Sequence, residues 1–323
     1  MISERTDIII DWLSFTCRTS SPKEVIDLLG LVDLPWITGR GRNGYRDSLR
    51  SLDIAICYSG QPGMGVWCEL SGQGCRAFEA LSTVGWDHLL GRILAPDTHI
   101  TRLDVSGDDH QGILPLEKIV NDSRHGNYIA KARSCQINQG HQNGTPIGTT
   151  IYFGSSSSKV KIRLYDKAAE QHLSPSEHWV RCELQLRDER ALRFLDVASN
   201  STLGQTYSGV LANYLRFVRP MKKEDSNKSR WPTRPYWRRF LGTTERISIY
   251  TTPGLAYTEE MCRQYVANQA GNAIAAAIEM YGVDGFLRLI DQRAIRPNPK
   301  YNELVANHFA RKAAISGSGD GAS

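Results

Sequence analysis

A strict alternation of apolar and polar side chains runs through residues 179–187, WVRCELQLR. Val180, Cys182, Leu184 and Leu186 fall on one side of an extended chain, and charged or amide side chains fall on the other. Successive side chains of a β-strand point to opposite faces, so a period of two predicts a strand. We therefore expect a half-buried strand with one apolar and one polar face.

Two further segments, residues 99–109 and 159–167, show the same alternation. In 99–109 the alternation places Ile100, Arg102 and Asp104 on one face. In 159–167 it places Lys161, Arg163, Tyr165 and Lys167 on one face. On the polar side of 179–187 it places Arg181 and Glu183. If these strands are neighbours in one sheet, they form a surface that mixes cations and carboxylates. Such a surface can hold a divalent metal on carboxylate oxygens and a phosphodiester on arginines.

Tyr165 is the candidate nucleophile of this surface. A free phenol has a pKa of about 10 and is a poor nucleophile at neutral pH, but nearby cations or a bound metal favour the phenolate. Attack on a DNA phosphate gives a phosphotyrosine ester and a free 3′-hydroxyl, and the ester retains the energy needed for rejoining.

Structural interpretations of the same residues stay open. Tyr165 also suits a strand tyrosine with a hydrated hydroxyl. Asp104 also suits a surface ion pair with Arg102, and Glu183 also suits a cross-strand ion pair on a solvated sheet.

The pattern of elements predicts an α+β fold. Strands are expected at 7–17, 51–59, 63–72 and 148–154, and helices at 21–30, 188–199 and 203–218, with Ser21 and Asp188 as caps. We expect an antiparallel sheet with helices packed on one side. A first domain is assigned to residues 1–220, a basic linker to 221–235, a helical segment to 236–315 and a disordered tail to 316–323.

Basic residues gather between positions 214 and 246, where ten Lys or Arg stand against three acidic residues. Aromatic residues are interleaved with them: Tyr214, Phe217, Trp231, Tyr236, Trp237 and Phe240. Cations mixed with aromatic rings suit phosphate contact and base stacking, although a solvated surface has a similar composition. The candidate DNA contacts here are Arg230, Arg234, Arg238 and Arg239.

Several classes of protein are not supported. The seven cysteines form no CxxC pair, and the sequence has no P-loop, dinucleotide fingerprint, GxSxG or HExxH motif. No apolar run approaches the roughly 20 residues of a membrane helix, and the start MISERTDIII does not resemble a secretion signal. We expect a cytoplasmic protein with no membrane segment.

A series of blocks then carries a resemblance: CELSGQGCRAFE (68–79), ITRLDVSGDD (100–109), GTTIYFGSSSS (148–158), IRLYDKAAEQ (162–171), VRCELQLRDERA (180–191) and NYLRFV (213–218). In this order they resemble the Rep_trans family of rolling-circle replication initiators. The resemblance implies that the chain binds an origin hairpin or single-stranded origin DNA and nicks one strand. It implies a covalent 5′-phosphotyrosine intermediate and a 3′-hydroxyl that primes synthesis.

The resemblance also assigns roles to residues. It implies Tyr165 as the nucleophile and Asp166 and Asp104 as ligands of a metal, Mg²⁺ or Mn²⁺. Asp11, Glu69 and Glu183 are further candidates for holding the metal. In a flat strand Asp166 points away from Tyr165, so both reach one phosphate only where the strand ends or bulges. A homodimer and a host helicase are the implied partners.

Two other functions remain as alternatives. One is a relaxase that nicks an integrative or conjugative element for transfer. The other is a DNA-binding regulator that uses the same scaffold without cleaving DNA.

Overall fold

The structure is a computed structural model that describes residues 7–174, 176–221, 227–242, 246–249 and 271–292. The chain divides into two compact units, residues 1–250 and 251–323. The described part of the second unit is helix α10 (Gly271–Gln292), which is interrupted at Gly282. Much of the helical segment expected at 236–315 and the whole tail expected at 316–323 lie outside the described residues.

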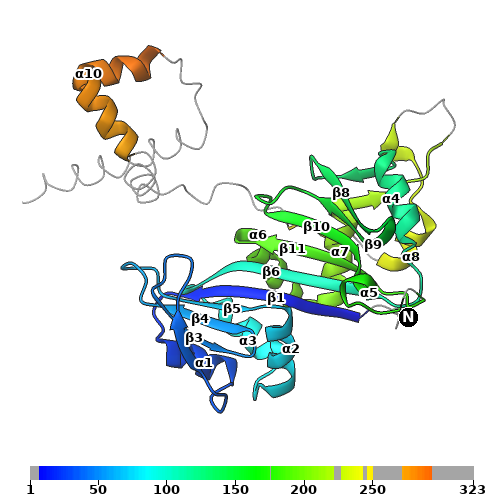
Figure 1. The fold of residues 1–323 in the computed structure, drawn as a ribbon, viewed down its shortest axis with the longest axis horizontal. Helices are drawn as coiled ribbons and strands as arrows, with labels where there is room; N and C mark the ends of the chain where they lie inside the picture. The colour runs from blue at the N-terminus through cyan, green and yellow to red at the C-terminus, as the bar shows by residue number, and fades with distance from the viewer. Residues whose placement is uncertain (1–6, 175, 222–226, 243–245, 250–270, 293–323) are drawn as a thin grey trace, which may run out of the picture. The chain divides into compact units, whose positions relative to one another are not determined.

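One sheet of ten strands organises the first unit, in the order β2-β3-β4-β5-β1-β6-β11-β10-β9-β8, and every neighbouring pair is antiparallel (Figure 1). Its strands are β1 (Asp7–Cys17), β2 (Ile37–Arg40), β3 (Asp47–Ser51), β4 (Ile54–Tyr58), β5 (Val66–Leu70), β6 (Thr98–Asp109), β8 (Cys135–Gln142), β9 (Thr145–Phe153), β10 (Val160–Asp166) and β11 (Val180–Arg187). A second sheet pairs β7 (Tyr128–Ala130) with β12 (Leu215–Phe217). The α+β class with a large antiparallel sheet is confirmed.

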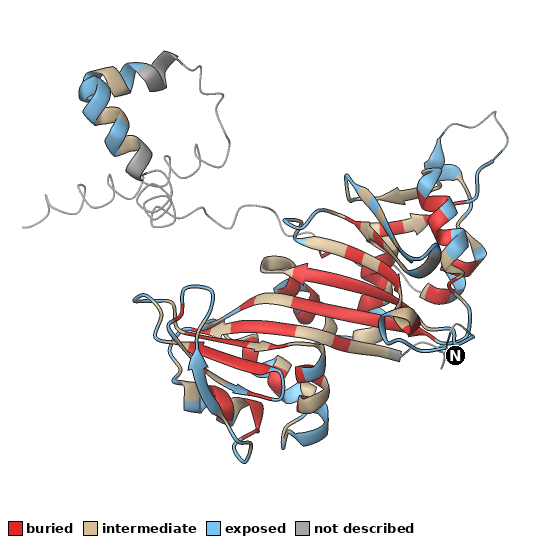
Figure 2. Ribbon diagram, in the orientation of Figure 1, coloured by how far each residue is buried: buried red, intermediate tan, exposed pale blue. Residues whose placement is uncertain are grey.

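Helices contribute to one continuous core with the apolar face of this sheet. They are α1 (Pro22–Leu29), α2 (Gly72–Leu81), α3 (Trp86–Ile93), α4 (Leu116–Arg124), α5 (Lys167–Glu170), α6 (Glu189–Ala198), α7 (Leu203–Tyr214) and α8 (Pro235–Leu241), with a 3-10 turn η1 (Lys228–Arg230). Phe15 of β1, Phe78 of α2, Phe194 of α6 and Tyr207 of α7 lie in the same buried cluster. Burial is deepest in the central strands, which are mostly red in Figure 2.

Local signals in the sequence explain where α1 begins and ends. The Ser21 hydroxyl accepts a hydrogen bond from the Glu24 backbone N–H, and the Glu24 carboxylate accepts one from the Ser21 N–H at 2.6 Å. Pro22 occupies the first turn, and Gly30 ends the helix at φ 61°. The helix predicted at 21–30 is confirmed with both of its caps.

Three local expectations were wrong. Asp188 precedes α6 but its side chain makes no capping bond, because it pairs with Lys159 and lies near His99 at 3.4 Å. The helix expected to run to 218 ends at Tyr214, and the chain continues as β12. Ile100 lies in the core opposite Phe15, because a register shift in the β1–β6 pair moves it off the face of Arg102.

The polar side of β11 is not solvated as expected. Every residue of Val180–Leu186 is buried, including Arg181 and Glu183. The strand lies between β6 and β10, so long polar side chains of both neighbours cover it.

Helix α8 belongs to the first unit, which extends to Tyr250. Trp237 is fully buried, packs edge-on against Phe217 at 5.1 Å, and donates its indole N–H to the Leu215 carbonyl at 3.0 Å. Tyr236 and Phe240 are also buried. These rings fill the core, so the base-stacking role considered for them does not hold.

Candidate active site

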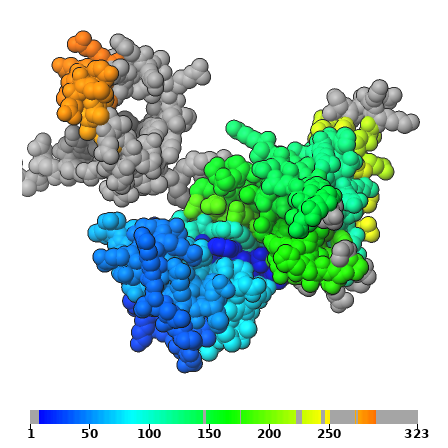
Figure 3. Space-filling model, in the orientation of Figure 1, coloured from blue at the N-terminus to red at the C-terminus, as the bar shows by residue number. Residues whose placement is uncertain are grey.

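One face of the sheet gathers the polar side chains predicted from the alternation, and we call it the polar face. It is defined by Trp12 of β1, Arg102, Asp104, Ser106 and Asp108 of β6, Arg181, Glu183, Gln185 and Arg187 of β11, and Lys161, Arg163 and Tyr165 of β10. The view in Figure 3 shows the first unit hollowed along β1 and β6. The prediction that these strands are neighbours is correct.

Strand register arranges the polar face in rows. Tyr165 lies opposite Arg181, which in turn lies opposite Asp108. Arg163 lies opposite Glu183 in the next row. The side chains that can react and the side chains that can bind phosphate therefore lie on adjacent inner strands of the sheet.

Tyr165 is the second-to-last residue of β10 and is only 3% exposed. The Arg163 guanidinium lies 4.2 Å from its ring centroid, and the Lys167 ammonium lies 5.7 Å from it. Burial raises the pKa of the Tyr165 phenol, although Arg163 and Arg181 act in the opposite direction. The phenol therefore keeps its proton at neutral pH.

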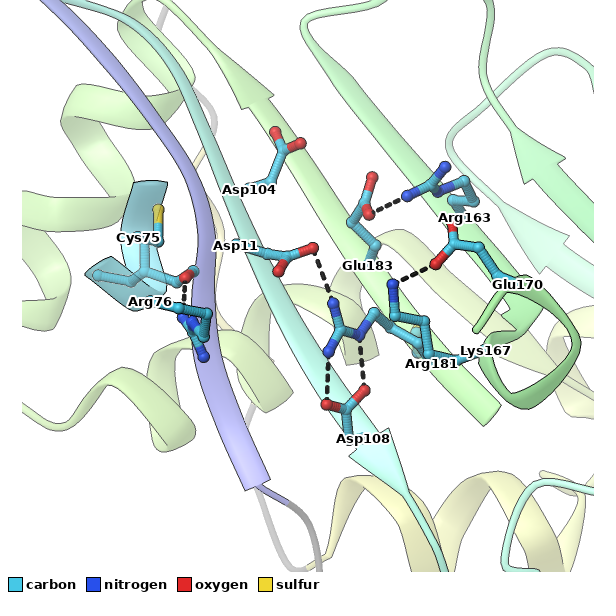
Figure 4. Close-up of polar contacts among 12 residues, drawn as sticks. Asp11, Cys75, Arg76, Asp104, Asp108, Arg163, Lys167, Glu170, Arg181 and Glu183 are labelled. Carbon is cyan, nitrogen blue, oxygen red and sulfur yellow. Dashed lines mark hydrogen bonds and ion pairs between the residues drawn. The ribbon is translucent and has the colours of Figure 1, made fainter. Parts of the chain in front are cut away.

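Arg181 is held by two carboxylates. Its Nε and Nη2 donate to the two oxygens of Asp108 at 2.6 and 2.7 Å, and its Nη1 donates to Asp11 at 2.8 Å (Figure 4). The side chain of Arg181 is 5% exposed. A bidentate, buried guanidinium of this kind is fixed in position. Arg181 therefore gives Tyr165, which lies opposite it on β10, a fixed neighbour.

Asp104 forms an ion pair with Arg102, whose Nε lies 2.9 Å from Oδ1. Burial raises the pKa of Asp104 to about 7, and the nearby carboxylates of Glu183 and Asp11 contribute in the same direction against Arg102. Carboxylates crowded in this way repel one another unless cations lie between them.

Glu183 is buried and accepts a hydrogen bond from Arg163 Nη2 at 2.5 Å. Asp104 and Glu183 are therefore both ion-paired, as the structural interpretations expected, but each pair has its carboxylate buried and not on a solvated surface. They are compatible with a functional site, because the same arginines are available to an incoming phosphate.

Asp166 is separated from the other candidates. β10 does end at this residue, but the Asp166 carboxylate turns to cap α5 and accepts a hydrogen bond from the Ala169 N–H at 2.9 Å. It lines a cavity of about 670 Å³ between α4, β9 and α5. Asp166 points away from Tyr165 because neighbouring residues of a strand point to opposite faces and because its carboxylate caps the first turn of α5.

The described residues do not form a metal site as they lie. No three of their His, Cys, Asp and Glu side chains are grouped closely enough to hold an ion. Asp11, Asp104 and Glu183 lie on the same side of the sheet in Figure 4, but each is engaged by an arginine.

The remaining predicted cations lie in different surroundings. On the polar face, the Lys161 ammonium lies 4.3 Å from the Tyr152 ring, and at its edge Lys167 pairs with Glu170. Arg234 pairs with the fully buried Asp122, so it stabilises the attachment of α8. Arg230, Arg238 and Arg239 are exposed on η1 and α8, away from the polar face.

Among the residues of the polar face, Asp108 and Trp12 are charged or aromatic side chains that sequence reasoning missed. Asp108 continues the alternation of Arg102 and Asp104, which would have been sufficient to find it. Trp12 stands in the apolar run IIIDWL and resembles a core residue, but the irregularity at Asp11 turns it to the polar side, where Arg102 stacks on it at 4.2 Å.

Comparisons with known proteins agree with this arrangement. Residues 98–290 match the family model described as replication initiation factor (Rep_trans), and residues 7–89 match the model for the N-terminal domain of rolling-circle replication initiation proteins. The chain is 26% identical over 286 residues to the putative DNA relaxase NicK of Bacillus subtilis, which covers 84% of this chain and 80% of that protein. It is also similar to the structure of a rolling-circle replication initiator protein from Geobacillus stearothermophilus, with a TM-score of 0.69 and 30% identity over 76% of this chain and all of that one. In the described residues no helix is both long and apolar enough to cross a membrane.

Proposed function

The chain belongs to the replication initiation factor family of rolling-circle replication proteins, and from this premise we propose that it nicks one strand of origin DNA with Tyr165 as the nucleophile. One observation carries the assignment. Tyr165 lies on the polar face between Arg163 and Arg181, on a rigid central strand. A phenol placed beside phosphate-binding cations is what a transesterification at phosphorus requires.

The proposed reaction balances without an external energy source. The Tyr165 oxygen gives up its phenol proton and forms a bond to the scissile phosphorus. The bond from phosphorus to the 3′ oxygen breaks, and that oxygen takes up a proton, so no proton is gained or lost overall. The 5′ phosphate stays on Tyr165, and the free 3′-hydroxyl serves as a primer. The reverse attack by a 3′-hydroxyl releases the enzyme.

The accessible cations of the polar face are proposed to hold the DNA phosphates. The side chains of Arg102 and Arg163 are 26% and 30% exposed, whereas Arg181 is enclosed by Asp108 and Asp11. Arg102, Arg163, Lys161 and Lys167 are thus proposed to contact phosphates, and Arg181 to position the strand beneath them. Arg230, Arg238 and Arg239 are proposed as a separate contact to the surrounding DNA.

A divalent metal, Mg²⁺ or Mn²⁺, remains part of the proposal. Its candidate donors are Asp104, Asp11 and Glu183, whereas Asp166 would have to leave its helix cap. Phosphates that bind Arg102 and Arg163 would release Asp104 and Glu183 from their ion pairs. Oxygen donors of this kind suit either ion.

The partners and the place of action also remain proposals. We propose origin DNA in a hairpin or single-stranded form as the substrate, a host helicase and a second copy of the chain as partners, and the cytoplasm as the location. The division into a nicking domain and a C-terminal origin-contact segment is proposed with the boundary moved to residue 250, where the first compact unit ends.

The nucleophile is tested by substituting Tyr165→Phe. Purified protein is incubated with an oligonucleotide copied from an inverted repeat that flanks the gene, in Mg²⁺, in Mn²⁺ or with EDTA. We expect a covalent adduct on a denaturing gel for the wild type with either metal, and none for Tyr165→Phe or with EDTA.

Tyr152→Phe is the matched control. Tyr152 lies opposite Arg163 on the neighbouring strand β9 and also contacts a lysine through its ring. Its variant should form the adduct at the wild-type rate. An adduct that persists in Tyr165→Phe would refute the assignment.

A relaxase is the second candidate function, favoured by the similarity to NicK. A relaxase carries out the same transesterification, but on an integrative or conjugative DNA element, and the nicked strand is transferred to another cell. Adduct formation on a transfer origin but not on a replication origin would support it. Binding without any adduct would instead support the non-catalytic regulator.

A further inference from the structure

A groove opens on the polar face about three strands away from Tyr165. We call it the Trp12 groove and define it by Trp12, Ile37, Arg42, Arg50, Leu52 and Glu69, which line a cavity of about 500 Å³ with their neighbours. Volumes of this size accept small organic ligands.

The groove is continuous with the proposed active site. Strand register places Ile37, Arg50, Ala55, Glu69 and Ser14 in one row on one face, and Ser14 lies opposite Arg102. Trp12 itself lies opposite Asp104. A ligand that extends along the polar face therefore reaches the groove without crossing the sheet.

The chemistry of the groove suits a flat ring with polar edges. The Arg102 guanidinium lies over the Trp12 ring at 4.2 Å, and the Trp12 indole N–H is buried without a hydrogen-bond acceptor. Ile37 and Leu52 are 70% and 50% exposed, although both are large and apolar. A buried donor that lacks a partner costs free energy, which a ligand acceptor would recover.

Charges at the groove suit a ligand that also carries a phosphate. Arg50 donates to the Arg40 carbonyl at 2.9 Å, and Arg42 is paired with Glu69. Burial raises the pKa of Glu69 against the effect of Arg42 and Arg102. A phosphate can therefore engage Arg50 or displace Glu69 from Arg42.

We propose that the Trp12 groove binds one unpaired nucleotide of the nicked strand, with its base against Trp12 and its phosphate near Arg50. This inference rests on the proposed function, because it takes the strand to run across the polar face to Tyr165. Aromatic side chains beside cations are the usual platforms for single-stranded bases, and bases inside a duplex are not available to them.

Sheet geometry limits which nucleotide is bound. Tyr165 and Trp12 are three strands apart and their rows are four residues apart, so with spacings of about 4.8 and 3.3 Å they lie about 19 Å apart. At about 3.4 Å per stacked nucleotide this corresponds to at most about six nucleotides. The bound base is expected within that distance of the scissile phosphate.

The test measures binding of a fluorescent single-stranded 12-mer of mixed sequence and of an abasic 12-mer with the same backbone. All proteins are full-length and carry Tyr165→Phe, so that binding is measured without cleavage. Stacking of one base is worth about tenfold in affinity. We expect Trp12→Leu to weaken binding of the normal 12-mer about tenfold and to leave the abasic 12-mer unchanged.

Two further variants keep this result interpretable. Trp12→Phe retains an aromatic ring and should preserve most of the preference for bases even if Trp12→Leu is poorly folded. Trp86→Leu removes a tryptophan from α3, where its N–H donates to Glu79 at 2.9 Å, and should leave both affinities unchanged.

The outcomes separate the two proposals. Suppose that the wild type forms the covalent adduct, and that Trp12→Leu and Trp12→Phe bind both 12-mers with the affinities of the parent Tyr165→Phe protein. The groove proposal is then overturned and the nuclease proposal stands. If Trp12 controls the preference for bases but no adduct forms with wild type, the groove proposal stands and the nuclease proposal fails.

Discussion

Asp109 is the last residue of β6, and its carboxylate is fully buried. It accepts hydrogen bonds from the backbone N–H groups of Gln111 at 2.9 Å and Leu114 at 2.6 Å, and it lies 3.1 Å from His178 Nε2. Burial alone would raise the pKa of Asp109, but these donors outweigh it and lower the pKa. One carboxylate thus holds two loops at the end of β6.

Asp109→Asn should destabilise the protein by about 1–3 kcal/mol at pH 7, because an amide accepts fewer of these bonds. A lowered pKa in the folded state adds stability above the unfolded pKa of about 3.9, and this stability is lost as pH falls through the folded pKa. The difference between wild type and variant should therefore shrink below about pH 4. Urea unfolding at pH 7 and at pH 3.5 measures it.

Asp27→Asn is the control for this prediction, since Asp27 is exposed on α1. It should change the free energy of unfolding by less than about 0.5 kcal/mol at both pH values. A destabilisation of Asp109→Asn that is equal at pH 7 and pH 3.5 would contradict the role given to the ionised carboxylate.

Individual residues differ in how far the sequence predicts them. Alternation is sufficient for Arg102, Asp104, Arg163, Tyr165 and Glu183, because a strand between two neighbours has only two faces. For Asp166, alternation predicts a side chain that points away from Tyr165, and the structure agrees, because the Asp166 carboxylate caps α5.

Trp12 shows a limit of this reasoning at the same scale. Its exposure to the polar face depends on the register shift between Ile10 and Trp12, which arises from pairing with a strand about 90 residues later. No local pattern in the sequence reports that pairing.

At the level of elements, α7 crosses the apolar face of β6 at Gly107. The Tyr207 hydroxyl donates to the Cys182 carbonyl at 2.6 Å, and a Cβ atom at Gly107 would lie 2.9 Å from that hydroxyl and 3.1 Å from the Phe240 ring. The absence of a side chain at Gly107 is what allows this helix and α8 to approach the strand.

Gly107→Ala should therefore destabilise the protein by about 1–3 kcal/mol through overpacking. Gly91→Ala in α3 is the matched control, since a Cβ atom there meets nothing within 4 Å and alanine favours a helix by up to about 1 kcal/mol. Thermal unfolding should move in opposite directions for the two variants. A Gly107→Ala protein as stable as the wild type would show that α7 does not pack this closely.

Elements follow from the sequence where local chemistry and packing agree. The α1 helix has its capping box, its proline and its terminal glycine within ten residues, and it forms as predicted. The basic and aromatic stretch after Tyr214 was ambiguous, because buried and base-stacking aromatic residues have the same composition. Contacts with β7 and α4 decide in favour of the core.

For the whole molecule, the contacts of the segment after Tyr214 with β7 and α4 extend the first folded unit beyond residue 220, to residue 250. Residues 215–241 complete the second sheet and place Trp237, Tyr236 and Phe240 in the core. The Tyr236 hydroxyl donates to the buried Asp122 at 2.9 Å, which also pairs with Arg234. A chain that stops near residue 220 would leave Asp122 buried without either partner.

We expect a chain ended after Tyr250 to keep the Tm of the full-length protein within about 3 °C, because the first compact unit is complete at that residue. A chain ended after Pro220 loses three large core side chains, Tyr236, Trp237 and Phe240, each worth about 3–5 kcal/mol. For a domain of this size that corresponds to a Tm lower by about 10 °C or more. Differential scanning calorimetry of the two truncated chains measures the difference. If the two truncated chains have the same Tm, α8 does not stabilise the first unit, the nicking domain ends near residue 220, and the basic residues of α8 can move with bound DNA. If the shorter chain has the lower Tm, α8 is part of the folded unit that contains Tyr165, and its basic residues are fixed in that unit.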